Sequence, residues 1–328
     1  MSALLASGWS LVAWLGLVAA LVALARAHAS SRVPPPADPH AKARPPSDAL
    51  AWCWRASALL GFALTWTFMI RMALEDIARY PSLGAWSRES NLFFDAYRRV
   101  TETPAAWWWS QHLMAWALAG TLWFTTAGRA RGARAWPYLW LAMCVAVSVA
   151  LPLFAQRLRA AAPVARVRDD VHALVAVGIF GAAVALVATP VVGGAPFIVA
   201  MLVLHGGLLV PALVSQDDAS RDGRRVALRP IAIGVAVVCF LLHVFATLRL
   251  HDTPLRALGL VVVRDPAQSS ISGDVVLTWL ASTMLVATSR GRRRAVAFFV
   301  LAPVVSLGAA FVWAVLLTPR PPREGEVA

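Results

Sequence analysis

PAAWWWSQHLMAWALAGTLWFTT, residues 104–126, is a largely apolar run without a single charged residue. A helix needs about 20 predominantly apolar residues to cross a hydrocarbon core of ~30 Å, and this run is long enough. Thr103 and Pro104 at its start are a capping residue followed by proline, the order typical of a helix start. The stretch therefore predicts a helix that begins at Pro104 and crosses a membrane.

Apolar runs of similar length recur along the whole chain. Hydrophobic residues make up 59% of the 328 residues and charged residues only 14%, against roughly 25% charged in an ordinary soluble domain. Pro190, Gly193, Gly194 and Pro196 can mark either a tight turn between two spans or one broken helix. We place the spans at 4–25, 50–70, 105–127, 136–156, 171–189, 195–214, 229–248, 273–288 and 295–317. The predicted fold is an all-α, polytopic transmembrane helical bundle of about nine spans, or alternatively eight.

The first predicted span has two interpretations. Ala27-His28-Ala29 before Ser30 resembles a signal-peptidase site, which would make residues 4–25 a removed leader. The apolar stretch is longer than in a usual leader, however, and no lysine or arginine precedes it. We expect a retained transmembrane helix.

The formal net charge of +13 comes from short basic connections between the spans. Arginines cluster at 129–134, 221–225 and 290–294, as expected next to anionic lipid headgroups, so the lipid bilayer and not nucleic acid is the predicted partner. The expected location is a bacterial inner (plasma) membrane. With nine spans, the clusters at 129–134 and 290–294 fall on opposite sides of the bilayer, and the sequence leaves this conflict open.

No metal or cofactor is predicted. Cys53, Cys144 and Cys239 lie in separate apolar spans and match no zinc or thioredoxin spacing. His205 and His243 lie inside two predicted spans, where histidines can ligate a haem, but no regular spacing of histidine pairs supports one. We expect these two histidines to form hydrogen bonds between helices instead.

The chain resembles itself when it is shifted by 162 positions. Thr103-Pro104 then aligns with Asp265-Pro266, and His112 aligns with Asp274. Apolar helices also match by chance, but the two equivalent helix starts favour an internal duplication. Further aligned pairs are Val100 with Val262 and, after a shorter loop, Ser148 with Ser306. The predicted organisation is an N-terminal transmembrane helix and Pro/Ala-rich linker (1–49), a first helical repeat with a polar, Trp-rich loop (50–160), a connecting helical hairpin (161–228), a second repeat (229–318) and a polar tail (319–328).

Asp274 is the strongest single candidate for a catalytic residue. It lies just inside a predicted span, where a carboxylate is costly unless it is paired, protonated or faces a polar cavity. Thr278, four residues later, extends the polar stripe and favours a site that faces inward. The alternative is a carboxylate in the first turn of the helix, stabilised by the helix dipole.

The polar segment before residue 104 and the tryptophans after it form a second group of candidates. At helical spacing Asn91, Asp95 and Arg98 lie on one side, which predicts an ion pair between Asp95 and Arg98. Trp109, His112 and Trp116 share a face of the next helix. The alternative is that these aromatic residues only mark the membrane interface.

The segments Asn91–His112 and Ser269–Asp274 resemble a class of fungal and bacterial integral-membrane terpene cyclases, those of the macrophorin and ascofuranone type. The polar loop, Pro104-Ala105, Ser148 and Leu151–Phe154 are also similar to a short bacterial membrane family of unknown function. The resemblance covers 75–156 and 262–317.

The cyclase resemblance implies that an acid protonates a membrane-dissolved polyprenyl or meroterpenoid substrate and that aromatic rings stabilise the resulting carbocations. The expected catalytic residues are Asp274, as the acid, with Asp95 or Glu102 tuning it or sharing its role. Those expected to bind the hydrophobic substrate are Asn91, Arg98, Trp107, Trp108, Trp109, His112, Trp116 and Thr278.

Two other functions fit the same sequence. A two-repeat membrane transporter would line a water-filled path with Asp274, His112 and His205. A non-catalytic membrane subunit would tolerate Asp274→Asn and would purify with partner proteins. The sequence does not predict the oligomeric state.

Overall fold

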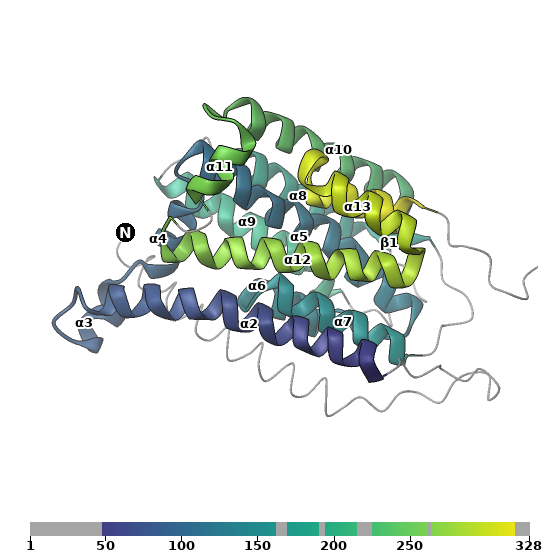
Figure 1. The fold of residues 1–328 in the computed structure, drawn as a ribbon, viewed down its shortest axis with the longest axis horizontal. Coiled ribbons are helices and arrows are strands. Elements are labelled where there is room, and N and C mark those ends of the chain that lie inside the picture. Colours follow the sequence, from purple (N-terminus) through teal and green to yellow (C-terminus); the bar gives the residue numbers. More distant parts are fainter. Residues whose placement is uncertain (1–47, 162–168, 190–193, 215–224, 262–263, 319–328) are drawn as a thin grey trace, which may run out of the picture.

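A computed structural model describes residues 48–161, 169–189, 194–214, 225–261 and 264–318 (Figure 1). Within them the elements are α2 (Asp48–Ile77), α3 (Leu83–Glu89), α4 (Leu92–Arg99), α5 (Pro104–Ala130), α6 (Trp136–Cys144), α7 (Val147–Ala160), β1 (Asp170–His172), α8 (Ala173–Ala188), α9 (Gly194–Leu213), β2 (Arg225–Ala227), α10 (Leu228–Leu248), α11 (Pro254–Val261), α12 (Pro266–Arg290), α13 (Arg292–Val305), α14 (Leu307–Phe311) and the π-helical turn η2 (Val312–Leu317).

The predicted all-α class is confirmed. Among the residues that the structure describes, three helices are long and apolar enough to cross a membrane, and they cover Ala49–Ile77, Leu228–Leu248 and Pro266–Arg290. Shorter apolar helices lie at Ala173–Ala188, Pro196–Ala212 and Leu307–Leu317. The predicted first span, its cleavage site and the tail 319–328 lie outside the described residues, as do Pro190 and Gly193.

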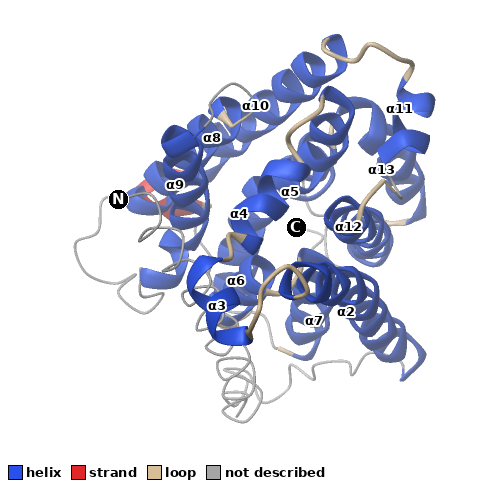
Figure 2. Ribbon diagram, turned by 90° about the vertical axis from the view of Figure 1, so that its left-hand side faces the viewer, coloured by secondary structure: helices blue, strands red, loops and turns tan. Residues whose placement is uncertain are grey.

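Helix α5 lies in the middle of the bundle (Figure 2), and most of its side chains are buried. It runs parallel to α12, since Trp109 and Trp116 on α5 bond successive serines on α12, Ser272 and Ser282. It runs antiparallel to α10, because Trp108 bonds Thr247 whereas Ala115 meets Cys239.

The segment predicted as one span at 136–156 is a helical hairpin. Helix α6 ends at Cys144 and α7 begins at Val147, and the Trp66 indole N–H donates to the Val145 carbonyl beside the break at 3.2 Å. The two ends of the hairpin meet, since the Arg131 guanidinium donates to the Ala161 carbonyl at 2.9 Å. The expectation of a single crossing is therefore wrong here: the chain enters the bundle and returns to the end from which it came.

The segment predicted as a span at 295–317 is a second hairpin of the same kind. Helix α13 ends at Val305, the backbone turns at Ser306 with φ 99°, and α14 and η2 run back. Arg290 before α13 donates to the carbonyl of Val315 in η2 at 2.6 Å, so the ends of this hairpin also meet. Again the single crossing is wrong. The prediction failed because the chain turns inside an apolar run, and a hydropathy profile does not detect such a turn.

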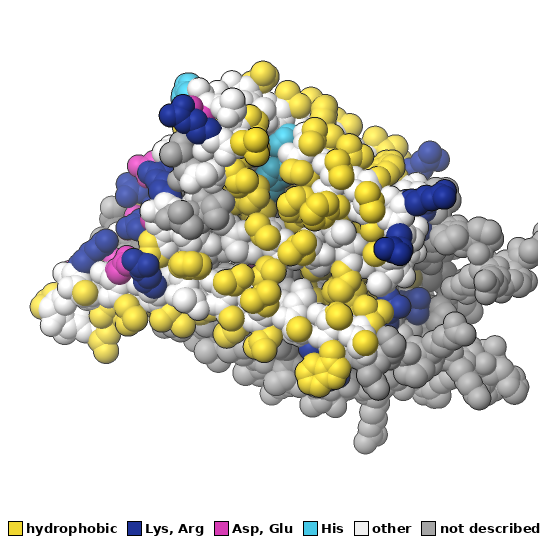
Figure 3. All heavy atoms as spheres, viewed as in Figure 1, with side chains coloured by type: hydrophobic (Ala, Val, Ile, Leu, Met, Phe, Trp, Pro, Cys, Tyr) yellow, Lys and Arg dark blue, Asp and Glu magenta, His cyan; other side chains and the backbone are white. Residues whose placement is uncertain are grey.

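Charge divides the two ends of the bundle. At one end, which we call the arginine end, lie Arg129, Arg131, Arg134, Arg157, Arg159, Arg225, Arg229, Arg290 and Arg292–Arg294. Asp170 of β1 binds two of them there, Arg129 at 3.2 Å and Arg225 of β2 at 2.6 Å, and closes the antiparallel β1–β2 pair. The opposite end, the loop end, carries α3, α4 and α11 with acidic and basic side chains mixed (Figure 3).

Candidate functional site

Asp274 on α12 closes the first helix break. Its carboxylate accepts hydrogen bonds from the backbone N–H groups of Val147 at 3.2 Å and Ser148 at 2.7 Å, and from the Thr278 hydroxyl at 3.3 Å. The first N–H groups of a helix have no partner within the helix, so a carboxylate placed there acts as a cap. Asp274 is 5% exposed. The inward orientation predicted for Asp274 is confirmed, and the structure adds its two kinds of partner, the Thr278 hydroxyl and the start of α7.

His112 on α5 closes the second break in the same way. The backbone N–H of Leu307, the first residue of α14, donates to its Nδ1 at 3.3 Å. This fixes the tautomer, because an Nδ1 that accepts carries no proton and the proton of the neutral ring lies on Nε2. That Nε2 is buried without a hydrogen-bond partner among the described residues.

A second histidine holds the other side of this turn. His243 on α10 lies with its ring centroid 4.8 Å from that of His112, and it bonds the backbone of Val304. The Gln111 amide donates to His243 Nδ1 at 2.9 Å and to the Trp108 carbonyl at 3.1 Å. Two imidazoles therefore hold the turn at Ser306 from both flanks.

Tryptophan–serine hydrogen bonds tie α5 to α12 between the two breaks. The Trp109 indole donates to the Ser272 hydroxyl at 3.0 Å, and the Trp116 indole donates to the Ser282 hydroxyl at 2.9 Å. Both serines are buried. Small polar residues on one helix and indoles on its neighbour allow close packing with satisfied N–H groups inside a membrane.

A double-mutant cycle on Trp116→Phe and Ser282→Ala measures this contact. We expect each change to destabilise the protein and the pair to be coupled by about 0.5–1.5 kcal/mol, the range for buried side-chain hydrogen bonds between membrane helices. Unfolding in mixed detergent micelles would give the values. Additive single effects would contradict the bond.

The predicted tryptophans are all buried in the bundle, whereas the predicted loop acids lie apart from Asp274. Trp107, Trp108, Trp109 and Trp116 are all buried, and Trp109 lies with its ring 5.8 Å from that of His112. Among the loop candidates, Asp95 pairs with Arg98 at 3.6 Å, as predicted. Asn91, Arg98 and Glu102 are exposed at the loop end. No hydrogen bond joins Asp95 or Glu102 to Asp274 in the described part of the chain.

The histidines His205 and His243 form hydrogen bonds between helices, as predicted. Tyr97 of α4 donates its hydroxyl proton to His205 Nε2 at 2.7 Å, while His205 Nδ1 donates to the Met201 carbonyl at 2.8 Å. Burial raises the pKa of the Tyr97 hydroxyl. Both ring nitrogens of His205 thus have hydrogen-bond partners. No group of three or more metal-ligating side chains lies in the described ranges.

Sequence reasoning missed the residues at the two turns. Val147, Ser148 and Leu307 act through backbone N–H groups, which no side-chain pattern reveals. The alignment of Ser148 with Ser306 was the available signal, since both serines lie at a break.

The comparisons with known proteins add no neighbour: no family model, no curated protein and no solved structure matches this chain. The geometry of the two helix breaks is therefore the basis on which a function can be assigned.

Proposed function

We propose that the chain is an integral membrane protein built from two parallel repeats, each ending in a re-entrant hairpin. In this proposal α4, α5 and α6–α7 correspond to α11, α12 and α13–α14. Three observations support it. The Thr103 and Asp265 side chains cap their helices alike, each accepting from the N–H three residues later. The two hairpins open to the same end, and the aligned residues His112 and Asp274 each bond the hairpin tip of the other repeat.

The hairpins also remove the conflict over membrane orientation. A hairpin returns the chain to its own side, so the arginines at 129–134 and 290–294 belong to one side of the bilayer. Arginine-rich connections favour the cytoplasm. The arginine end is therefore cytoplasmic in this proposal, and the loop end with Glu102 and Asp252 faces outward.

We infer further that the protein carries a small solute across the membrane, with the two hairpin tips as its gates. The observation that carries this inference is the pair of helix breaks inside the bundle, each capped by an ionisable side chain. Non-helical backbone at membrane depth is tolerated only inside protein or beside a water-filled path, and broken helices are a recurring feature of transporter binding sites. Ionisable residues at that depth mark ion and substrate pathways.

The terpene cyclase hypothesis is supported less by the same geometry. It requires the Asp274 carboxyl group to hold a proton ready for a hydrocarbon. Both carboxylate oxygens instead accept backbone N–H groups, an arrangement that gives the carboxyl group a structural role as the cap of α7. A search for cyclic products from farnesyl- or geranylgeranyl-bearing quinols would test the cyclase hypothesis directly.

Cysteine accessibility tests the transport proposal without knowledge of the solute. Ser148→Cys and Ser306→Cys are introduced singly after Cys53, Cys144 and Cys239 have been replaced by alanine. A gate must open to water during its cycle, so a membrane-impermeant thiol reagent is expected to modify both tips in sealed vesicles, each from one side. Mass spectrometry gives the modified fraction over time.

Ser282→Cys is the matched control, because Ser282 is fully buried on α12. We expect the thiol of this variant to react at about a tenth of the rate of the tips or more slowly still, since the rate depends on access to the thiol. If both tip variants react as slowly as Ser282→Cys in every condition, the hairpins are fixed structural elements and the transport proposal fails.

A further inference from the structure

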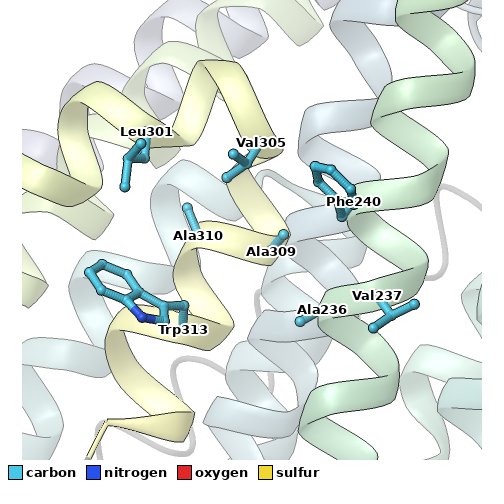
Figure 4. A pocket seen from close by; sticks show the side chains of 8 residues that line it. All are labelled: Ala236, Val237, Phe240, Leu301, Val305, Ala309, Ala310 and Trp313. Atoms are coloured by element: carbon cyan, nitrogen blue, oxygen red, sulfur yellow. The ribbon is translucent and has the colours of Figure 1, made fainter.

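An apolar groove of about 410 Å³ runs along the outside of the second hairpin (Figure 4). Its walls come from α10, α13, α14 and η2, and they are formed by Ala236, Val237, Phe240, Leu301, Val305, Ala309, Ala310 and Trp313. Phe240, Leu301 and Trp313 are 43%, 40% and 46% exposed. In a bilayer this groove opens to the hydrocarbon, where its walls offer contact to a chain of methylene groups.

Both helices that flank the groove carry an arginine in register with it at the arginine end. On α10, Arg229, Ala236 and Phe240 lie at i, i+7 and i+11, which places them on one face of the helix. On α13, Arg294, Leu301 and Val305 have the same spacing. Neither arginine forms an ion pair with a carboxylate among the residues that the structure describes.

The length of the groove along α13 matches the thickness of one leaflet of the bilayer. At 1.5 Å per residue, Leu301 lies about 10 Å and Val305 about 16 Å from Arg294 along the helix. Half of a hydrocarbon core of ~30 Å is about 15 Å. A lipid whose phosphate lies between the two arginines would thus place an acyl chain along the whole groove.

We propose that this groove binds one acyl chain of an anionic phospholipid from the leaflet at the arginine end, with the phosphate held by Arg229 and Arg294. Guanidinium groups bind phosphate through charge-assisted hydrogen bonds. A zwitterionic lipid carries an ammonium group that the same arginines repel, so the site selects by headgroup charge. The site lies outside the hairpin tips and does not depend on the transport proposal.

Native mass spectrometry of the detergent-purified protein tests the proposal. The protein is mixed with equal amounts of phosphatidylglycerol and phosphatidylcholine that have identical chains. We expect wild type to retain one phosphatidylglycerol in preference. Arg229→Gln combined with Arg294→Gln is expected to lower that retention roughly tenfold or more, since each arginine near a charged membrane surface contributes about 1 kcal/mol.

Two matched controls separate this site from general attraction to a basic protein. Arg71→Gln with Arg88→Gln removes the same charge at the loop end and should leave retention unchanged. Ala236→Phe fills the groove and should abolish retention, whereas Leu241→Phe, on another face of α10, should not. Equal retention in the Arg229/Arg294 double variant would overturn the proposal. So would unchanged retention in Ala236→Phe, because the groove would then not hold the chain.

Discussion

Replacement of Asp274 by asparagine is expected to lower the free energy of unfolding by about 2–4 kcal/mol, the range for a lost hydrogen bond to a charged group that leaves a buried donor unsatisfied. Each carboxylate oxygen of Asp274 accepts a different backbone hydrogen bond, one from the Val147 N–H and the other from the Ser148 N–H. Asparagine offers one oxygen and one NH2 group, so one backbone N–H must face another donor. Because Asp274 is buried inside the bundle, bulk water cannot satisfy that N–H group. Unfolding of the purified protein in mixed detergent micelles measures the change.

Asp95→Asn is the matched control, with the same chemical change on a half-buried carboxylate at the loop end. Asp95 pairs with Arg98 at 3.6 Å on the surface of α4, and exposed ion pairs contribute about 0–1 kcal/mol. Hydrogen exchange adds a local readout: the amides of Val147 and Ser148 should exchange faster in Asp274→Asn and not in Asp95→Asn. If both variants are equally stable and exchange alike, Asp274 does not hold the hairpin.

The starts of the long helices could be predicted because their causes are local. Thr103 before Pro104 and Asp265 before Pro266 each accept a hydrogen bond from an N–H group in the first turn of the helix that follows. Donor and acceptor are three residues apart, so a short stretch of sequence is enough to predict the interaction. The pair Asp95–Arg98 was predictable for the same reason, since its members lie one helical turn apart.

The hairpins could not be predicted because their causes are distant. Hydropathy measures whether a segment prefers hydrocarbon, and a hairpin inside protein is as apolar as a crossing. The break before Val147 contains no glycine or proline, and it is stabilised by Asp274, 127 residues away. At the second break, Pro303 lies inside α13 two residues before its end, and the partner of the turn, His112, lies 195 residues from Leu307.

Separation along the chain also explains which of the predicted site residues lie near Asp274 and which do not. Sequence spacing singled out His112, Asp274, Thr278 and the buried tryptophans because polar or aromatic residues in an apolar run are conspicuous. The cyclase resemblance joined Asp95 and Glu102 to Asp274 as further acids of the same site. Chemical likeness does not imply proximity, and these two loop acids remain at the loop end without a contact to the break.

Replacement of Gly308 by alanine is expected to destabilise the protein by about 3 kcal/mol or more, at or above the upper end for overpacking a buried site. Gly308 lies in α14, directly after the turn held by His112. A Cβ at this position would lie 2.4 Å from the Ala115 carbonyl oxygen, 2.6 Å from its carbon and 3.0 Å from Cys239 Sγ. The first two are backbone atoms of the central helix α5 and cannot rotate away. The added methyl group must therefore push the second hairpin off α5, and unfolding in detergent micelles should detect the loss.

Gly234→Ala is the control that isolates this contact. Gly234 lies inside α10, and a Cβ there would meet nothing within 4 Å, so alanine should be neutral or stabilising by up to about 1 kcal/mol through its higher helix propensity. Movement of the hairpin has a second consequence: the Leu307 N–H would leave His112, and its amide should exchange faster in Gly308→Ala alone. A Gly308→Ala protein as stable as Gly234→Ala would mean that the second hairpin does not pack against α5. The hydrogen bond from Leu307 to His112 would then be in doubt, and it is one of the two reciprocal caps on which the two-repeat proposal rests.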